Sequence, residues 1–165
     1  MRRLLSLATI SLLSACGSAD AAQDAAEPQA VLASATGEQA LPTILVYKTP
    51  SCSCCNGWVE HLRAAGFTVE AENRRDMERI KTENGIPTEL RSCHTGFVGG
   101  YFVEGHVPAA DLKRLLKERP KLAGLSVPNM PIGSPGMEGP NASPYQVLSF
   151  DHQGRAAVFA EIDPR

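Results

Sequence analysis

From residue 43 onward, short apolar runs alternate with stretches in which apolar residues recur at helical spacing. The continuous apolar run over 43–47 is typical of a strand buried on both faces of a sheet. Apolar residues between 58 and 65 then fall on one helix face, and Gly66 is a common signal for the end of a helix. A short strand over 67–69 and a helix over 76–84 follow. This half of the region therefore predicts the order strand, helix, strand, helix.

The second half of the region predicts two more strands, a helix, a long loop and a final hairpin. Two short apolar runs about a two-glycine turn indicate a hairpin over 95–104. A leucine-striped helix over 108–119 begins and ends at prolines. Residues 127–140 are rich in proline, glycine and methionine, which predicts a loop long enough to cover a site. A last hairpin spans 145–162. A βαβα half followed by a ββα half resembles the thioredoxin-like α/β fold, here extended by the loop and a C-terminal β-hairpin.

The N-terminus has the layout of a bacterial lipoprotein signal. Two arginines precede an apolar stretch over 4–13 that is too short to span a bilayer comfortably. The Leu-Ser-Ala-Cys sequence that follows resembles a lipobox, in which cleavage leaves Cys16 as a lipidated N-terminus. A plain secretory signal cleaved at the same place is the alternative. We therefore expect a signal peptide over 1–15.

The next segment, residues 16–40, predicts a lipid-anchored flexible tether. It consists mainly of Ala, Gln, Glu, Asp and Ser, and so offers little apolar surface for burial. Gly17 and Ser18 resemble a sorting signal for the outer membrane of Gram-negative cells. The expected location is the periplasmic side of the envelope, where only the lipid contacts the membrane. Residues 41–165 are then one domain of ordinary size.

Charge excludes one large class of partners. The chain has a formal net charge of −2, and loss of the two N-terminal arginines with the signal makes it −4. A mildly acidic chain without basic runs has no electrostatic footprint for nucleic acid.

Three of the five cysteines stand together at positions 52, 54 and 55, between the first predicted strand and the first predicted helix. Neighbours such as Cys54 and Cys55 can form a disulfide with each other only with strain. The cluster suits thiol redox chemistry, with Cys52 and Cys55 as a Cys-x-x-Cys pair, or a soft metal that accepts several thiolates. Helix amides and the helix dipole lower the pKa of thiols at a helix start, so we expect thiolates here.

The predicted topology places further soft ligands beside this cluster. In thioredoxin-like folds, the first helix starts, the third strand starts and the fourth strand ends at one edge of the sheet. Here Cys93 and His94 lead into the third strand, and His106 follows the fourth. A rival alignment places Ile86-Pro87-Thr88 at the cis-proline position of thioredoxins, but residues 89–92 make a poor buried strand.

The two loop methionines and the two remaining histidines have different expected roles. Met130 and Met137 fit two roles, metal ligand or loop residue packed on the core. His61 is expected to be exposed or to cap a helix, and His152 to face solvent in a hairpin turn.

Thiolate, thioether and imidazole ligands together favour Cu(I) over hard cations, with zinc as the main competitor. A single tetrahedral zinc needs four ligands. The main candidates here are Cys52, Cys54, Cys55, Cys93, His94 and His106, with Met130 and Met137 in addition. A surplus of donors predicts bridging thiolates that hold more than one copper ion.

These motifs resemble the CopG-like periplasmic proteins of bacterial copper resistance, a family long catalogued as a metal-binding domain of unknown function. The resemblance covers nearly all of residues 43–160. It rests on Tyr47-Lys48-Thr49-Pro50-Ser51-Cys52-Ser53-Cys54-Cys55, Trp58, His61-Leu62, Gly66-Phe67, Ser92-Cys93-His94-Thr95, Glu104-Gly105-His106-Val107-Pro108-Ala109 and Gly133-Ser134-Pro135-Gly136-Met137-Glu138. It implies a thioredoxin-like fold, copper as the ligand, and a role in copper handling or redox interconversion. The lipobox is not part of this resemblance.

Two functions are consistent with these residues. The first is a copper-binding protein of copper resistance or homeostasis, which holds Cu(I), interconverts Cu(I) and Cu(II), and has other copper-handling envelope proteins as partners. The second is a thiol-disulfide oxidoreductase of the cell envelope that uses Cys52 and Cys55. The third sulfur of the cluster and the two flanking histidines favour metal binding, so we assign no catalytic residue.

Overall fold

A computed structural model describes residues 40–165 of the chain. The expected signal peptide over 1–15, the lipidation site Cys16 and the tether up to residue 39 lie outside the described residues. Within the described part, no helix is long and apolar enough to cross a bilayer.

The described residues form seven β-strands, three α-helices and one short 3₁₀-helix. In chain order these are β1 (Ile44–Lys48), α1 (Ser53–Ala64), β2 (Val69–Asn73), α2 (Met77–Glu83), η1 (Thr88–Leu90), β3 (His94–Val98), β4 (Tyr101–Gly105), α3 (Ala109–Glu118), β5 (Gly124–Val127), β6 (Tyr145–Phe150) and β7 (Ala156–Ile162).

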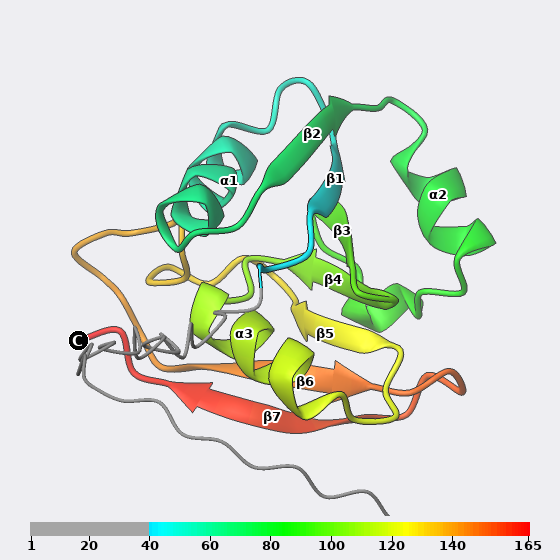
Figure 1. Cartoon of the computed structure of the whole chain (residues 1–165). Helices are drawn as coiled ribbons and strands as arrows, with labels where there is room; N and C mark the ends of the chain where they lie inside the picture. Colours follow the sequence, from blue (N-terminus) through cyan, green and yellow to red (C-terminus); the bar gives the residue numbers. More distant parts are fainter. Residues whose placement is uncertain (1–39) are drawn as a thin grey trace, which may run out of the picture. The chain divides into compact units, whose positions relative to one another are not determined.

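The strands form one sheet in the order β2-β1-β3-β4-β5-β6-β7 (Figure 1). β1 pairs in parallel with β2 and antiparallel with β3, and β3 pairs antiparallel with β4. These four strands and the three α-helices form a thioredoxin-like unit, which confirms the predicted fold class. β5 adds a parallel strand to β4, and the predicted C-terminal hairpin of β6 and β7 completes the sheet.

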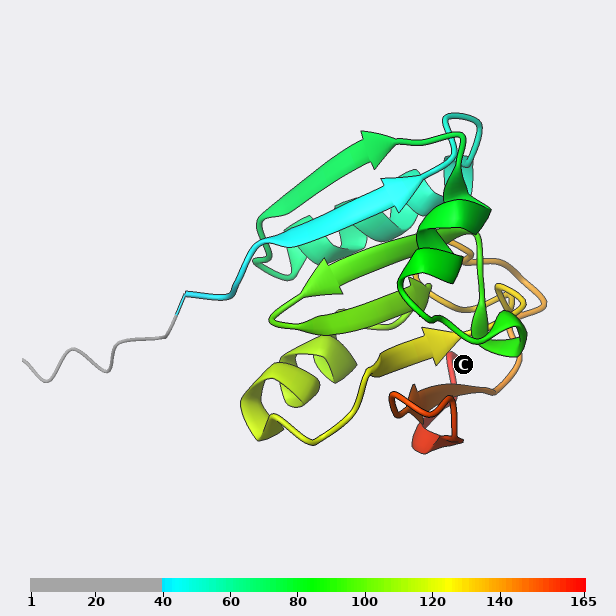
Figure 2. The ribbon, with the colours of Figure 1, turned by 90° about the vertical axis from the view of Figure 1, so that its right-hand side faces the viewer.

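The main core lies on the face of the sheet that α1 and α3 cover. It includes Trp58 and Leu62 from α1, Leu112 and Leu115 from α3, and Val103 from β4, none of which is exposed. α2 lies on the opposite face (Figure 2). Burial of each such side chain stabilises the fold by about 1.5–3 kcal/mol. This core therefore fixes the orientation of α1, whose first turn carries the cysteine cluster.

Two strands differ from the sequence prediction. β2 spans Val69–Asn73, whereas the pattern predicted a strand over 67–69, because the residues after Val69 lie at a sheet edge, are exposed and show no apolar run. β5 was not predicted, since its four residues are all buried and too few to show any alternation. β3 starts at His94, as the preferred alignment expects, and residues 40–165 contain no cis peptide bond.

The N-terminal segment joins the domain at the end of β1 that lies away from the cysteines. Residues 40–42 line a cavity of about 640 Å³ together with Leu116 and Lys117 from the last part of α3 and Arg119 just after it. The chain then runs along β1 and reaches the cysteine cluster only beyond Lys48. The N-terminal segment therefore enters at one end of the domain, and the cysteine cluster lies at the other end.

The loop between β5 and β6 packs directly on the first turns of α1. A Cβ atom on Gly57 would lie 2.9 Å from the Cα of Gly136, which is closer than side-chain atoms approach. A Cβ on Gly136, whose φ is +81°, would lie 2.6 Å from the backbone nitrogen of Trp58. Two glycines facing each other thus allow this loop to lie over the cysteine cluster.

We expect Gly57→Ala to separate the loop from α1. Alanine favours a helix by about 1 kcal/mol over glycine, but the overpacking costs about 1–3 kcal/mol. The free energy of unfolding should fall, and residues 128–142 should become more sensitive to proteolysis. Gly139→Ala is the control, because its Cβ would meet only the tip of Ile132, at 3.3 Å. Unchanged proteolysis of the loop in Gly57→Ala would contradict this packing.

Candidate metal centre

The cysteine cluster occupies the first turn of α1, with Cys52 immediately before the helix. Cys52 and Cys55 are joined by a disulfide, and their Cα atoms are 5.4 Å apart. The Sγ atom of Cys54 lies 3.6 Å from that of Cys52. Two of the three expected thiolates are therefore oxidised, because a three-residue step at a helix start suits disulfide geometry. This pair is the one that the Cys-x-x-Cys interpretation requires.

Cys93 is the centre of the second group of donors. Its Sγ atom lies 3.4 Å from the Sγ of Cys55, 3.4 Å from Nδ1 of His94 and 3.5 Å from Nε2 of His106. The ring of His94 lies between those of Trp58 and His106, with centroid distances of 4.2 and 5.4 Å. The indole of Trp58 is fixed in turn by donating a hydrogen bond to the carbonyl of Val107 at 2.8 Å.

The six main candidates form two overlapping sets of four donors. Within each set all donor atoms lie within 4.8 Å of one another; the sets are Cys52, Cys54, Cys55 and Cys93, and Cys55, Cys93, His94 and His106. Cys55 and Cys93 belong to both. Thus the edge of the sheet brings together residues from the start of α1, the start of β3 and the end of β4.

Burial keeps the two histidines neutral. Neither ring is exposed, and desolvation lowers the pKa of His94 well below its usual value and lowers that of His106. The backbone of Gly105 and of Pro135 raises these pKa values by a smaller amount. Nε2 of His94 and Nδ1 of His106 make no hydrogen bond of good geometry. Both rings are therefore neutral imidazoles, the form that binds metals.

The Cys93 thiol is protonated at neutral pH. Burial, with a smaller contribution from Cys54, raises its pKa to about 11. Cys93 directly precedes β3 and does not belong to the helix start that carries the other three cysteines. A metal that binds Cys93 must therefore displace a proton.

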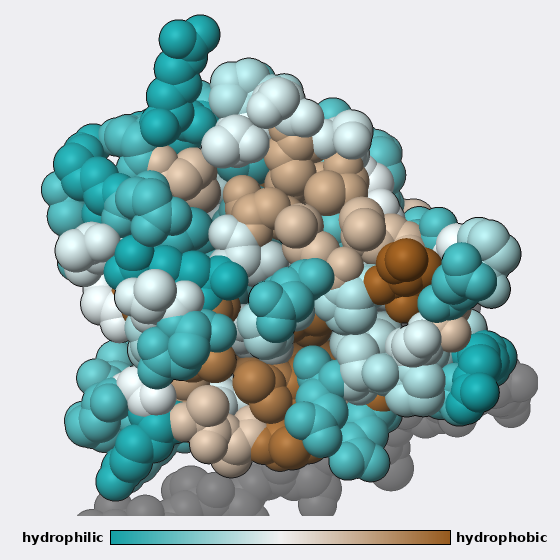
Figure 3. All heavy atoms as spheres, turned by 180° about the vertical axis from the view of Figure 1, so that it is seen from behind, coloured by the Kyte–Doolittle hydropathy of each residue, from teal (hydrophilic) through white to brown (hydrophobic). Residues whose placement is uncertain are grey.

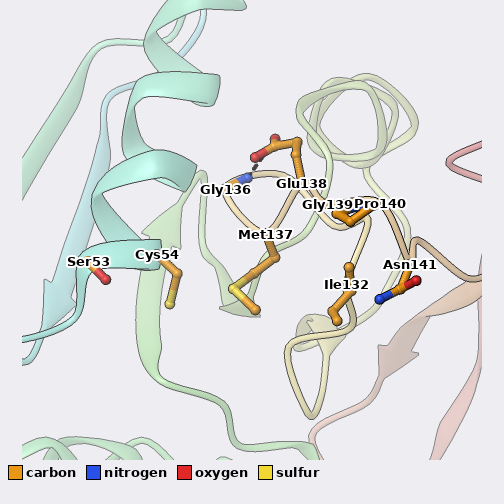
Figure 4. Close-up of a pocket in the computed structure, with 9 residues that line it drawn as sticks. All are labelled: Ser53, Cys54, Ile132, Gly136, Met137, Glu138, Gly139, Pro140 and Asn141. Carbon is orange, nitrogen blue, oxygen red and sulfur yellow. Dashed lines mark hydrogen bonds between the residues drawn. The ribbon is translucent and has the colours of Figure 1, made fainter.

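The β5–β6 loop brings one of the two candidate methionines to the cluster. Cys54 and Met137 line an open cavity of about 470 Å³, together with Ser53, Ile132 and residues 136–141. Figure 4 shows both sulfur atoms pointing into the same space. The carboxylate of Glu138 accepts a hydrogen bond from the Gly136 amide at 2.8 Å, which stabilises this turn of the loop. Met130 does not line this cavity.

The remaining histidines lie as expected. Nε2 of His61 accepts a hydrogen bond from the backbone N–H of Ala109 at 3.0 Å, so His61 caps α3. Desolvation lowers the pKa of His61, in spite of the nearby Glu138, and this favours the neutral form that the cap needs. His152 is exposed in the turn between β6 and β7.

Sequence reasoning missed a buried polar network behind the donors. Lys81 on α2 and Glu104 on β4 are 1% and 0% exposed, and form an ion pair at 2.7 Å. Both belong to otherwise apolar patterns, Lys81 beside Ile80 on the inner side of α2 and Glu104 at the end of an apolar strand. A charged residue in each of two apolar patterns is the only signal that could have revealed the pair.

One side of the domain carries a group of apolar side chains at its surface. Seen from behind, a patch of apolar colour lies within a largely hydrophilic face (Figure 3). Ile132, which is 45% exposed, lines the same cavity as Cys54 and Met137. The cavity lined by Cys54 and Met137 thus has an exposed apolar side chain beside the polar side chains of Ser53 and Glu138.

Comparison with solved structures identifies the family. Two structures described as copper resistance protein CopG, form 1 and form 2, are 46% and 45% identical to this chain, each with a TM-score of 0.70. Each covers 74% of this chain, which in turn covers 98% and 99% of them. This chain belongs to the CopG family of copper-resistance proteins. The resemblance noted from the sequence is therefore confirmed.

A family model described as a protein of unknown function, DUF411, also matches residues 90–137. That range contains Cys93, His94 and His106, and ends at Met137. No curated protein matches the sequence significantly.

The neutral histidines of this CopG-family protein predict how its stability depends on pH. Unfolded histidine binds a proton below pH about 6.5, whereas His94 and His106 resist protonation in the fold. Unfolding therefore takes up protons in this range, and the free energy of unfolding falls as pH falls. The expected slope is up to about 1.4 kcal/mol per pH unit for each such histidine.

Denaturant unfolding of the metal-free disulfide form between pH 7.5 and 5.5 measures this slope. His94→Gln removes one of the groups and should give a shallower dependence. A stability that does not change over this range would contradict the neutral, buried state of the rings.

Proposed function

We propose that this protein binds copper, as Cu(I), when its cysteines are reduced. The observation that supports this most is the convergence of four cysteine sulfurs and two buried, neutral imidazoles within two overlapping sets of donors. Soft sulfur ligands together with imidazole favour Cu(I), and zinc is the main competitor. The proposed ligands are Cys52, Cys54, Cys55, Cys93, His94 and His106.

Binding of more than one copper ion explains this number of donors more simply than binding of a single ion. Cys55 and Cys93 belong to both sets, and a thiolate shared between sets is suited to bridging two ions. Met137 is proposed as an additional ligand, because its sulfur and that of Cys54 point into one cavity (Figure 4). Met130, which does not line this cavity, has less support.

The Cys52–Cys55 disulfide connects copper binding to redox chemistry. Its reduction takes two electrons and two protons and provides two further thiol ligands. In the opposite direction, the dithiol can reduce two Cu(II) ions to Cu(I), forming the disulfide and releasing two protons. We therefore include interconversion of Cu(I) and Cu(II) in the proposed function.

The place of action that we propose is the periplasmic side of the envelope, at the outer membrane. The lipobox that ends in Cys16 supports a lipid anchor, and this lipid is the only proposed contact with the membrane. Other copper-handling envelope proteins are the proposed partners.

Titration of the phosphine-reduced protein with Cu(I), in competition with a chromophoric chelator, tests this function. Tight binding is expected, with Zn²⁺ unable to displace Cu(I). The double variant Cys52→Ser/Cys55→Ser should lose more affinity than the roughly 10- to 100-fold typical of outer-shell changes. Ser53→Ala, which lies between these cysteines and leaves all thiols intact, is the control. The function is refuted if the parent binds weakly, or if the double variant binds as tightly as the parent.

A second function is supported by the disulfide itself. In thiol-disulfide exchange, the Cys52 thiolate attacks a substrate disulfide and releases one substrate thiolate. Cys55 then displaces the other and restores the Cys52–Cys55 disulfide. Cys55 is completely buried and Cys52 is less so, which suits these two roles.

An insulin-reduction assay and a measured redox potential test this second function. If it holds, Cys52→Ser and Cys55→Ser are inactive while His94→Gln and His106→Gln retain the parent's turnover, because exchange does not need imidazole. Absence of turnover with any disulfide substrate would rule it out and leave copper binding as the function.

A further inference from the structure

Cys93 and His94 are adjacent, yet both their side chains reach the donor cluster. Successive side chains of a strand point to opposite faces of the sheet. His94 is the first residue of β3 and stacks on Trp58 of α1, whereas Thr95 faces the side of α2, where Lys81 contacts it. Regular alternation would place Cys93 on the side of Thr95. Its sulfur instead lies 3.4 Å from Cys55 on α1, so the chain must depart from strand geometry at Cys93.

The buried network holds the backbone on both sides of this irregular residue. The carboxylate of Glu104 accepts a hydrogen bond from the Ser92 amide at 2.8 Å. The ammonium of Lys81 donates to the His94 carbonyl at 3.3 Å. One contact thus precedes Cys93 and the other follows it.

Thr95 completes the network and connects it to the sheet. Its hydroxyl donates to Glu104 at 2.5 Å and accepts from Lys81 at 2.8 Å. Thr95 and Glu104 are paired residues of β3 and β4, so the pairing of these strands fixes the position of the Glu104 carboxylate relative to Thr95. The Ser92 segment also lies against Gly105, where any Cβ would come within 2.6 Å of the Ser92 hydroxyl.

Stability alone gives little reason to retain such a pair. Desolvation of two buried charges offsets much of their attraction, and apolar residues of similar volume often replace a buried ion pair without loss of stability. What apolar residues cannot replace is the acceptor for the Ser92 amide and the donor to the His94 carbonyl.

We propose that Lys81 and Glu104 are positioning residues, which hold the Ser92–Thr95 backbone so that Cys93 and His94 present their sulfur and imidazole to the same metal centre. Neither side chain is a ligand, and both act from the α2 side of the sheet through main-chain hydrogen bonds. This inference rests on the proposed copper-binding function.

A matched pair of double variants separates hydrogen bonding from packing and charge. Lys81→Leu/Glu104→Leu removes the whole pair, and leucine adds no further sulfur near the metal. Lys81→Leu/Glu104→Gln removes the same charges but keeps an amide oxygen that accepts from Ser92. Phe150→Leu, in the separate core cluster with Leu90, controls for loss of stability alone.

Cu(I) affinity of the reduced proteins is the first measurement. We expect a loss of about 10- to 100-fold in Lys81→Leu/Glu104→Leu, the range found for outer-shell partners. Lys81→Leu/Glu104→Gln should lose less affinity than this but still bind more weakly than the parent, because it keeps the acceptor for Ser92 and lacks the Lys81 donor. Phe150→Leu should bind as the parent does. Equal affinities for the two double variants would overturn the inference. Failure of the parent itself to bind Cu(I) would instead refute the proposed function.

Hydrogen exchange of the Ser92 amide gives a second measurement that needs no metal. The amide should exchange at least tenfold faster in the Leu/Leu variant than in the Leu/Gln variant, because only glutamine keeps its acceptor. If the Leu/Leu variant does not fold, Lys81→Leu/Glu104→Gln is compared with the parent. Weaker Cu(I) binding there than in the parent supports positioning, because that variant lacks the Lys81 donor to the His94 carbonyl, and binding equal to the parent overturns it.

Discussion

The directions of three strands determine where the donors of this protein can meet. β1 ends, β3 begins and β4 ends at the same edge of the sheet, because β3 is antiparallel to both neighbours. The register pairs Lys48 with His94 and Thr95 with Glu104, so residues just outside these pairs are brought together. Cys55 and Cys93, whose sulfurs touch, are separated by 38 residues in the chain. The donor set therefore exists only in the folded chain, and metal binding must stabilise that fold.

The sheet also separates two kinds of chemistry. On the α1 face lie sulfur and imidazole, in an apolar setting that keeps the rings neutral and the Cys93 thiol protonated. On the α2 face lie the ammonium and carboxylate of the buried pair, which are satisfied by each other and by backbone groups. Soft donors are thus kept apart from charged oxygen, which would favour harder cations. The main chain around Cys93 connects the two, because the buried pair contacts the Ser92 amide and the His94 carbonyl on either side of it.

Local pattern was enough to predict the thioredoxin-like order, since each of its elements carries its own apolar run or stripe. It failed at β5, whose four buried residues have no period to detect, and at β2, whose polar end is held only by pairing with β1. The predicted topology already placed His94 and His106 beside the cysteine cluster. The Lys81–Glu104 pair was missed, because a charged residue in each of two apolar patterns does not by itself show that α2 and β4 bring the two side chains into contact. The Gly57–Gly136 contact, which seats the loop over Cys54, likewise appears only in three dimensions.

The N-terminal segment enters beside the last turns of α3, whereas the sulfurs open at the opposite end of the domain. α3 has ten residues, so about 15 Å of helix separates the two ends. A chain held by its N-terminus would present the donor cavity outward, away from its point of attachment. A protein that exchanges metal with the chain would then reach the donor cavity without passing the proposed anchor.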